Sequence, residues 1–315
     1  MNRSGDEEVE ISVLVSTRGR PGPLLDLCRS LRASLPPGTG CELVLAINDC
    51  PSAYPSLDEL RLQLPDWCKL VGFHEGRPGK SRALNGAIHA SRGRLLAFLD
   101  DDVLVEPDWI LQLRRAFTDP NIQAIGGGVE VHLEHPAPFW WTTHCAALFG
   151  CTRTWPFLEG QSIPYLCGSN MAVRREAVVS FWEDIGPGTQ AYPMGEDLLF
   201  AREIQRRGNS CVYYPSCRVR HLLPKARLTW SQLALRGWYT GGMKYRFEPK
   251  SGIKEVANSL ARIPIDSIRL LQHLLEGRRA EASDRLLWLV RHLGLLRETT
   301  RRNSVLATYP AVKQD

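Results

Sequence analysis

The sequence predicts an α/β fold, with a mixed, mostly parallel sheet, flanking helices and a C-terminal helical extension. Apolar runs of strand length alternate with segments of helical period between residues 10 and 103, a pattern typical of parallel strands joined by helical crossovers. From Leu228 onward the apolar residues recur at helical spacing. We therefore expect a disordered tail at 1–9, a catalytic-type domain at 10–227 and a helical extension at 228–315. The domain divides into halves at 10–103 and 104–227.

The first half contains alternating strands and helices. Its predicted strands cover residues 10–16, 41–47, 69–73 and the run that ends at Asp100. Its predicted helices follow Pro21 and cover 56–64 and 80–91. Pro36-Pro37-Gly38 ends the first helix and Gly93 ends the third, since proline and glycine do not continue helices well.

Three consecutive carboxylates, Asp100, Asp101 and Asp102, follow the apolar run that begins after Arg94. Burying like charges is costly unless a cation is bound nearby. Because side chains alternate along a strand, we expect Asp100 and Asp102 on one side and Asp101 on the other. Mg²⁺ or Mn²⁺ suits such a site, because it takes one or two carboxylates together with phosphate oxygens and water. The alternative interpretation is a solvated loop or a helix N-cap cluster.

Polar residues also follow the first two strands, at Thr17-Arg18 and Asn48-Asp49. Ligands of parallel sheets bind outside the carboxyl ends of the strands, so these residues and the aspartates are expected at one edge. Neither a dinucleotide-binding glycine motif nor a P-loop follows the first strand. A nucleotide bound here would therefore be held by acids and a metal.

The second half carries two further signals. Glu196 and Asp197 begin a predicted helix that ends at Gly208, and a strand from Cys211 ends at His221. Acids in a first turn also serve the helix dipole, and a lone histidine is commonly structural. In a chain with an acidic strand end, both also fit a catalytic site.

Composition restricts the class of protein. A net charge of +5 is too small to indicate nucleic-acid binding. The nine cysteines form no metal-ligand spacing and are expected to be reduced. No apolar run of about 18 residues is present, and the acidic N-terminus is unlike a signal peptide. A cytoplasmic enzyme is expected.

Taken in order, these segments resemble the family-2 glycosyltransferases, which have the GT-A (Rossmann-like) fold of nucleotide-diphospho-sugar transferases. The resemblance runs from about Glu10 to about His221. It is carried by the motifs VLVSTRGRP, AIND, GKSRALNGAIHASRGRLLAFLDDD, CGSNMAVRREAV, GEDLLFAREIQRRG and VRH. The segment 181–189 departs from the family pattern, because its glycines are displaced.

The resemblance implies roles for individual residues. In the family, Asp197 corresponds to the general base, with Glu196 beside it. The metal ligands implied are Asp100, Asp102 and His221. The donor-binding residues implied are Thr17, Arg18, Asp49, Lys80, Arg82, Asn85, Asp100, Asp101, Gly168 and Asn170.

The function implied is metal-dependent, inverting transfer of a sugar from a nucleotide-diphospho-sugar donor to a hydroxyl of a glycan or lipid-linked acceptor, with Mn²⁺ or Mg²⁺ as cofactor. The setting implied is the synthesis of cell-surface or exopolysaccharide glycans or glycolipids. Two alternatives remain: a catalytically silent GT-A domain acting as scaffold or sugar-nucleotide sensor, and, less well supported, a nucleotidyltransferase.

Two segments allow two interpretations each. The aromatic insert 136–165 contains either acceptor contacts or core side chains. The helices after Leu228, which we expect to be interrupted at Gly241-Gly242, form either a packed lid or an interfacial anchor on anionic lipid at the inner face of the cell membrane.

Overall fold

The computed structural model describes residues 9–49, 56–189, 192–247 and 249–300. The chain forms two compact units. Unit 1 comprises residues 1–132 and 152–222, and unit 2 comprises 133–151 and 223–315. The tail expected to be disordered lies outside the described residues, apart from Val9, and so does the end of the helical extension after Thr300.

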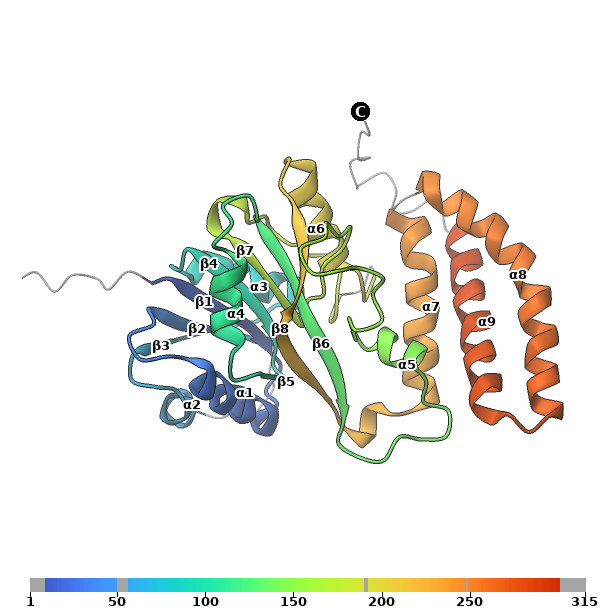
Figure 1. The fold of residues 1–315 in the computed structure, drawn as a ribbon, viewed down its shortest axis with the longest axis horizontal. Helices are drawn as coiled ribbons and strands as arrows, with labels where there is room; N and C mark the ends of the chain where they lie inside the picture. The colour runs from blue at the N-terminus through green and yellow to red at the C-terminus, as the bar shows by residue number, and fades with distance from the viewer. Residues whose placement is uncertain (1–8, 50–55, 190–191, 248, 301–315) are drawn as a thin grey trace, which may run out of the picture. The chain divides into compact units, whose positions relative to one another are not determined.

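Unit 1 is built on an eight-stranded sheet of order β3-β2-β1-β4-β7-β6-β8-β5 (Figure 1). Four neighbouring strands, β3, β2, β1 and β4, run parallel, while β7 is antiparallel to β4 and β6, and β5 is antiparallel to β8. The predicted mixed α/β fold is therefore confirmed. The strands are β1 Ile11–Thr17, β2 Cys41–Asn48, β3 Cys68–Glu75, β4 Leu95–Asp100, β5 Val103–Val105, β6 Ala124–Leu133, β7 Asn170–Arg174 and β8 Cys211–Leu223.

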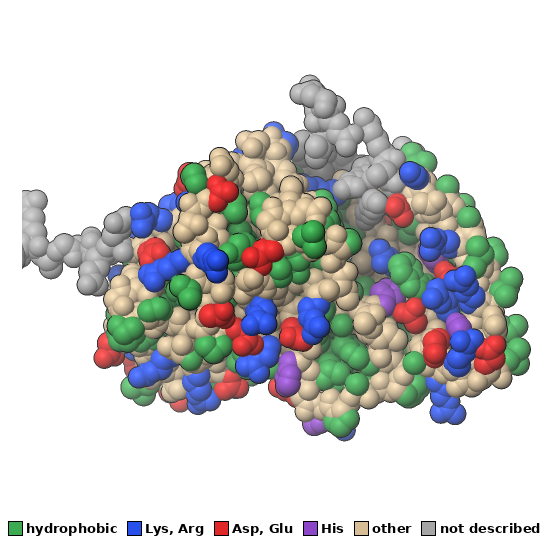
Figure 2. All heavy atoms as spheres, in the orientation of Figure 1, with side chains coloured by type: hydrophobic (Ala, Val, Ile, Leu, Met, Phe, Trp, Pro, Cys, Tyr) green, Lys and Arg blue, Asp and Glu red, His purple; other side chains and the backbone are tan. Residues whose placement is uncertain are grey.

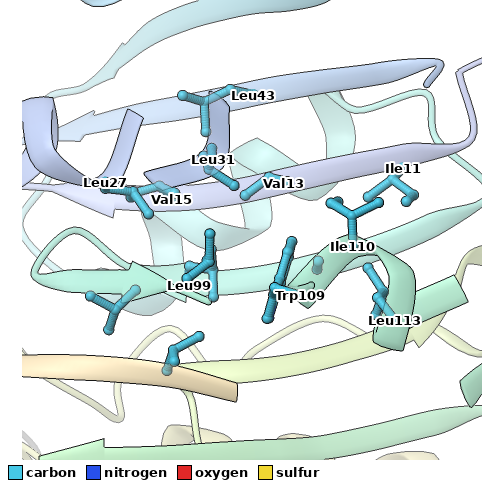
Figure 3. Close-up of a cluster of buried hydrophobic side chains, with 14 of the residues drawn as sticks. Ile11, Val13, Val15, Leu27, Leu31, Leu43, Leu99, Trp109, Ile110 and Leu113 are labelled. Carbon is cyan, nitrogen blue, oxygen red and sulfur yellow. The ribbon is translucent and has the colours of Figure 1, made fainter. Parts of the chain in front are cut away.

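Helices cover both faces of this sheet. The alternation of side chains along β1 sends Val13 and Val15 to the face covered by α1 and α4 (Figure 3), and Leu14 to the face covered by α3 and α6. The apolar runs are thus buried on both sides, as expected for parallel strands. The helices of unit 1 are α1 Pro21–Ser34, α2 Leu57–Gln63, α3 Lys80–Ala90, α4 Trp109–Ala116 and α6 Glu196–Arg206.

Local sequence explains where these helices begin. Pro21 lies at the start of α1, where its missing N–H is not needed. Ser56 and Glu59 form a reciprocal capping box on α2. Gly195, with φ of 94°, precedes α6 and turns the chain so that Glu196 and Asp197 occupy the first helical turn.

Unit 2 is helical. It contains α5 Thr143–Leu148, α7 Trp230–Phe247, α8 Pro249–Leu275 and α9 Arg279–Thr300. The predicted interruption at Gly241-Gly242 is wrong, because α7 continues to Phe247. Gly241 is instead needed for close packing: a Cβ there would lie 2.0 Å from the Arg291 carbonyl oxygen of α9. Gly294 of α9 meets the Trp238 carbonyl in the same way.

Other sequence expectations had mixed outcomes. The aromatic insert divides between the units: Trp140 packs on Trp230 in unit 2, while Trp155 packs on Tyr213 in unit 1. The eight described cysteines are all free and buried, as expected for small apolar residues. Within the described part of the chain, no helix combines the length and apolarity that a membrane crossing requires.

Candidate active site

The carboxyl edge of the parallel strands brings the polar strand ends together. The β1–β4 register pairs Ser16 with Asp100, and the β4–β7 register pairs Leu99 with Asn170. Ser169, just before β7, therefore meets Asp100 and donates a hydrogen bond to its Oδ2 at 2.6 Å. The strand ends form one site, as the sequence indicated.

Arg20 joins the next two aspartates. Its Nη1 lies 2.6 Å from Asp102 Oδ2, and its Nη2 and Nε both donate to Asp101. Thr17 Oγ1 donates to Asp101 Oδ2 at 2.6 Å. Burial raises the pKa of Asp101 and Arg20 works against that shift. Burial lowers the pKa of Arg20, but the two carboxylates outweigh it and raise that pKa.

The alternation expected along the acidic run stops at Asp100. Asp101 and Asp102 lie in the turn between β4 and β5, so the strand rule does not govern where they point. Both are almost fully buried, and the same guanidinium contacts both. The expectation that they lie on opposite sides of a strand is therefore wrong, because the strand has ended.

The pairing of β5 with β8 brings His221 to the aspartates. Val103 is opposite His221 in this antiparallel register, so His221 lies beside the residue that precedes Val103. Its Nε2 is 3.4 Å from Asp102 Oδ1, and both side chains are buried. The strand continues to Leu223, two residues beyond the predicted end, and Leu222 N–H donates to the Asp102 carbonyl at 2.8 Å.

Lys80, the first residue of α3, lies between two groups of carboxylates. Its Nζ is 2.5 Å from Asp100 Oδ1 and 3.8 Å from Glu196 Oε1. Burial opposes the charge of Lys80, but Asp100, Glu196 and Asp197 raise its pKa. In return, Lys80 holds the pKa of Asp100 below its usual value despite burial. Lys80 therefore stays an ammonium ion.

The two acids at the start of α6 differ in their contacts. Asp197 Oδ2 accepts a hydrogen bond from the Gly168 N–H at 3.1 Å, and its Oδ1 accepts one from the Leu198 N–H at 2.8 Å. Burial raises the pKa of Asp197. Burial also raises the pKa of Glu196, to about 7. A carboxyl with that pKa exchanges protons near neutral pH.

Gly168 leaves room beside these charged groups. A Cβ at this position would lie 3.4 Å from Lys80 Nζ and 3.7 Å from Asp197 Oδ2. A side chain there would occupy the space between the ammonium and the carboxylate.

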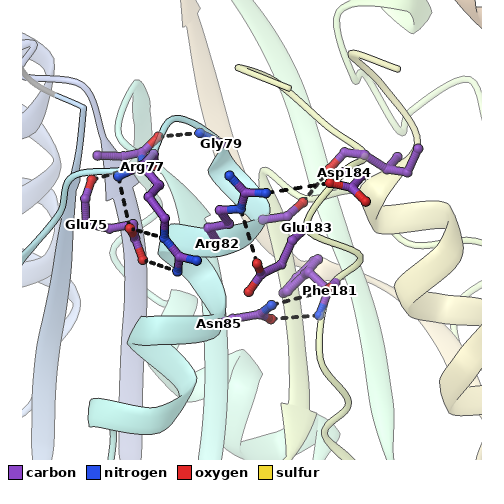
Figure 4. Close-up of polar contacts among 11 residues, drawn as sticks. Glu75, Arg77, Gly79, Arg82, Asn85, Phe181, Glu183 and Asp184 are labelled. Atoms are coloured by element: carbon purple, nitrogen blue, oxygen red, sulfur yellow. Dashed lines mark hydrogen bonds and ion pairs between the residues drawn. The ribbon is translucent and has the colours of Figure 1, made fainter. Parts of the chain in front are cut away.

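The remaining residues predicted to bind the donor are engaged with other parts of unit 1. Arg18 Nη2 lies 3.0 Å from Asp49 Oδ2 on the surface, so the ends of β1 and β2 are bridged. Arg82 pairs with Glu183 at 3.1 Å and with Asp184 at 3.6 Å (Figure 4).

Asn85 exchanges two hydrogen bonds with the main chain of Phe181, also visible in Figure 4. These contacts, together with those of Arg82, tie α3 to the segment 181–184.

Asn170 is turned into the core. Its Oδ1 accepts from the Trp109 indole N–H at 3.1 Å, and its Nδ2 donates to the carbonyls of Gly128 and Cys217. Close approach explains the neighbouring glycine, because a Cβ on Gly127 would lie 2.2 Å from Asn170 Nδ2. In this structure the Asn170 amide joins β7 to its neighbours.

Sequence reasoning assigned no role to Arg20, and it treated Ser169 only as part of a loop that resembles the family's loop against the donor sugar and acceptor. Arg20 lies in the loop that follows Thr17, next to the proline that begins α1, and that position was the available signal. Ser169 belongs to the quoted Gly168-Ser169-Asn170 motif, but its contact with Asp100 depends on the antiparallel β4–β7 pairing. Local pattern does not reveal that pairing.

The residues suit a hard divalent cation. Asp100 and Asp102 offer carboxylate oxygens and His221 offers an imidazole nitrogen, donors that Mg²⁺ and Mn²⁺ accept. Among the described residues, no three His, Cys, Asp or Glu side chains are already grouped as a metal cage. A site with few protein ligands is the usual arrangement where substrate phosphates complete the coordination shell.

The sequence profile described as "Glycosyltransferase like family 2" matches residues 11–240. The chain is 28% identical over 261 residues to the succinoglycan biosynthesis protein ExoM of Rhizobium meliloti, covering 80% of each protein. It is 26% identical over 160 residues to the glucosyl-dolichyl phosphate glucuronosyltransferase of Haloferax volcanii, covering 48% of this chain and 50% of that protein.

Two solved structures share the fold. The mannosyltransferase PcManGT from Pyrobaculum calidifontis, in complex with GDP-Man and Mn²⁺, has a TM-score of 0.55 and 17% identity, with 95% of this chain and 77% of that chain covered. GalNAc-T7 with UDP, GalNAc and Mn²⁺ has a TM-score of 0.53 and 16% identity, with 77% and 52% covered. At this identity the two structures establish the GT-A fold. The family match spans most of the chain, and the chain therefore belongs to glycosyltransferase family 2.

Proposed function

We propose that this protein is a metal-dependent, inverting glycosyltransferase that moves a sugar from a nucleotide-diphospho-sugar to a hydroxyl acceptor, in the synthesis of an exopolysaccharide, another cell-surface glycan or a glycolipid. The proposal agrees with a relative named for succinoglycan biosynthesis. It also agrees with two neighbours of the same fold whose structures hold Mn²⁺ with a nucleotide or nucleotide sugar.

One observation carries the proposal: Lys80 connects the acids at the end of β4, which begin with Asp100, to the acids that begin α6. Its Nζ is 2.5 Å from Asp100 and 3.8 Å from Glu196. The first group would hold the cation that binds the leaving diphosphate. The second group would meet the hydroxyl of the acceptor. Both lie in unit 1 and are separated by one side chain, a spacing that suits two reactants meeting at one carbon atom.

The donor side is assigned to the strand ends. Thr17, Arg18 and Asp49 would bind the nucleoside, and Asp101 would hold the strand-end loop in place through Thr17 and Arg20. Asp100, Asp102 and His221 would hold the divalent cation, which when bound neutralises charge that develops on the leaving diphosphate. Lys80 and Arg82 would add positive charge beside the diphosphate.

The acceptor side is assigned to α6 and the Gly168 loop. Asp197 would accept the proton of the attacking hydroxyl, because two N–H donors orient it and no side chain on Gly168 obstructs it. Glu196, with a pKa of about 7, would gain or lose a proton near neutral pH and so change the net charge beside Lys80. Asn85 and Asn170 would position α3 and β7 through the hydrogen bonds described above.

The test is a panel of nucleotide sugars with Mn²⁺, with Mg²⁺ and with EDTA. Thermal shift reports binding, because a ligand that prefers the folded state raises the melting temperature. Release of the nucleoside diphosphate reports turnover. We expect at least one donor that stabilises the protein only with metal and is turned over, and a product whose anomeric configuration is inverted by NMR.

The same panel tests the alternative of a catalytically silent sensor. Metal-dependent stabilisation by a donor, without release of nucleoside diphosphate in the presence of any acceptor, would support the sensor and contradict the enzyme. A product with retained configuration would contradict the assignment of Asp197 as the base of a single displacement.

A further inference from the structure

The helix α8 in unit 2 exposes its apolar face. Residues at intervals of three, four and seven fall on one side of a helix. Along α8 the positions that follow this rule are Ile253, Leu260, Pro264, Ile268, Leu271 and Leu275. The large apolar side chains among them are exposed, with Ile268 at 68% and Leu275 at 81%. We call this row of residues the outer stripe.

The face of α8 that packs on α9 contains buried polar groups among the half-buried Val256, Ile263 and Leu270. Ser259 Oγ lies 2.9 Å from His292 Nδ1 of α9. Asp266 Oδ2 lies 3.3 Å from His292 Nε2, and Asp266 Oδ1 lies 3.1 Å from Arg285 Nη1. Each of these buried groups would lose its partner if α8 turned about its axis. The network therefore fixes the rotation of α8 and keeps the outer stripe exposed.

The charges on the exposed part of α8 have one sign. Lys254, Arg262 and Arg269 are exposed, whereas Asp266 is buried against α9 and Glu255, seven residues before Arg262, is half-buried. From residue 253 to 275, no carboxylate is exposed. Figure 2 shows hydrophobic side chains along the edge where α8 lies, with cationic side chains next to them and acidic ones among these toward the lower end. Arg262 and Arg269 lie three residues before and four residues after Ile265, which is also exposed, so they flank the apolar surface of α8 on that side. An apolar surface flanked by cations matches a surface that is apolar inside and anionic at its boundary.

We propose that the outer stripe of α8 is a docking surface for an anionic lipid bilayer, with the helix lying in the interface. Leucine and isoleucine side chains would enter the acyl boundary, while Lys254, Arg262 and Arg269 would contact anionic headgroups. This proposal is independent of the proposed glycosyl transfer, because it concerns unit 2 and involves no donor or acceptor.

The experiment is flotation of the full-length protein with vesicles of phosphatidylcholine alone or of phosphatidylcholine with 30 to 40% phosphatidylglycerol, roughly the anionic content that gives a strong surface potential. We expect flotation with the anionic vesicles at low salt and little with the neutral ones. At about 0.5 M salt the electrostatic part should weaken, since screening acts within a few ångströms.

Two variants separate the contributions. Ile268→Gln with Leu271→Gln should reduce the partition onto anionic vesicles by roughly tenfold or more at every salt concentration. Arg262→Gln with Arg269→Gln should reduce binding mainly at low salt. The matched control is Leu62→Gln with Leu158→Gln, two exposed leucines of unit 1 at 75% and 79%, which should bind as the wild type does.

The opposite results are equally clear. Wild-type protein that stays unbound with anionic vesicles at low salt would overturn the proposal, as would full binding by the Ile268/Leu271 variant. Sedimentation equilibrium of the wild type and this variant tests the competing occupant: a dimer that this variant converts to a monomer would assign the outer stripe to a second copy of the chain. Release of nucleoside diphosphate, measured separately, distinguishes failure here from failure of the proposed function.

Discussion

Helices α3 and α8 are both amphipathic, and their most buried side chains differ in kind. In α3 the buried residues include Ala83, Leu84 and Ala87, which pack against the sheet. In α8 the fully buried residues are Ser259 and Asp266, Leu270 is half-buried, and the other leucines of the helix are exposed. The difference lies in the partners: α3 meets Leu14 and Val44 of the sheet, whereas α8 meets His292 and Arg285 of α9. A helical period shows that a helix has two faces, and the neighbouring element determines which one is buried.

The largest expected effect comes from the apolar interior of unit 1. Phe98 of β4 is 1% exposed and contacts Phe181 and Phe200 edge to face. Replacing it with alanine removes those contacts and leaves a cavity, so the free energy of unfolding should fall by about 3 to 5 kcal/mol. Urea denaturation followed by circular dichroism measures this.

Leu271→Ala in α8 is the matched control, because Leu271 is 59% exposed. Its effect should stay within about 0.5 kcal/mol. A large loss of unfolding free energy for Leu271→Ala would contradict the contrast between α3 and α8. It would mean that the outer stripe is covered by another part of the protein in solution.

The second prediction concerns the acids that unit 1 buries at its site. Asp197→Asn keeps the shape of the side chain and loses its basicity, so turnover should fall by roughly 10² or more, about 2.7 kcal/mol of transition-state stabilisation. Donor affinity should be retained. Asp102→Asn should instead abolish metal-dependent donor binding while the fold is kept, because the amide keeps the shape of a side chain that contacts Arg20 and His221 but loses the charge that would hold the cation.

Asp26→Asn is the control for both variants, since Asp26 pairs with Arg29 on the surface of α1. It should show wild-type turnover and donor binding. Unchanged turnover in Asp197→Asn would reassign the base, and metal-independent donor binding by the wild type would contradict the metal ligands.

The sequence sufficed for much of this site and for little of unit 2. Thr17, Asp49 and Asp100 were placed correctly at one edge, because parallel strands bring their carboxyl ends together and each strand is locally recognisable. The contact of His221 with Asp102 depends on the β5–β8 register. Likewise, Arg20 reaches Asp101 and Asp102 across a separation of about 80 residues. Such pairings depend on which distant segments fold next to one another, and no local period contains that information.

The same limit explains the two errors about helices and turns. Gly241 was interpreted as a breaker, since glycine has low helix propensity, but close packing of α7 on α9 requires it. The alternation expected for Asp101 and Asp102 assumed that β4 continued past Asp100. In both cases a tertiary contact overrode a local preference.

The third prediction tests the polar face of α8. Asp266→Ala leaves Arg285 and His292 without their carboxylate, and the free energy of unfolding should fall by about 2 kcal/mol. Ser267→Ala, on the exposed side of the same helix, is the control and should have little effect. If Asp266→Ala were neutral, the network would not fix the rotation of α8, and the exposure of the outer stripe would lose its explanation.

The smallest effect expected is a dependence of stability on pH that arises from Glu196. Its pKa is raised by burial to about 7 in the folded protein, from an ordinary value of 4.5. Between these values the folded state holds a proton that the unfolded state has released, so the free energy of unfolding falls as pH rises from 4.5 to 7 and then stays level. Other groups shape the whole curve, and the difference between wild type and Glu196→Gln isolates this carboxyl. Because glutamine stays neutral, the melting temperature of the variant should fall less between pH 5 and pH 7 than that of the wild type. The difference between the two falls should be about a few degrees. Glu130→Gln, an exposed control on β6, should follow the wild type. If the melting temperatures of wild type and Glu196→Gln followed parallel curves against pH, Lys80 would be keeping Glu196 ionised throughout. The comparison of the two units would then be between two ion pairs, Lys80 with Glu196 in unit 1 and Arg285 with Asp266 in unit 2.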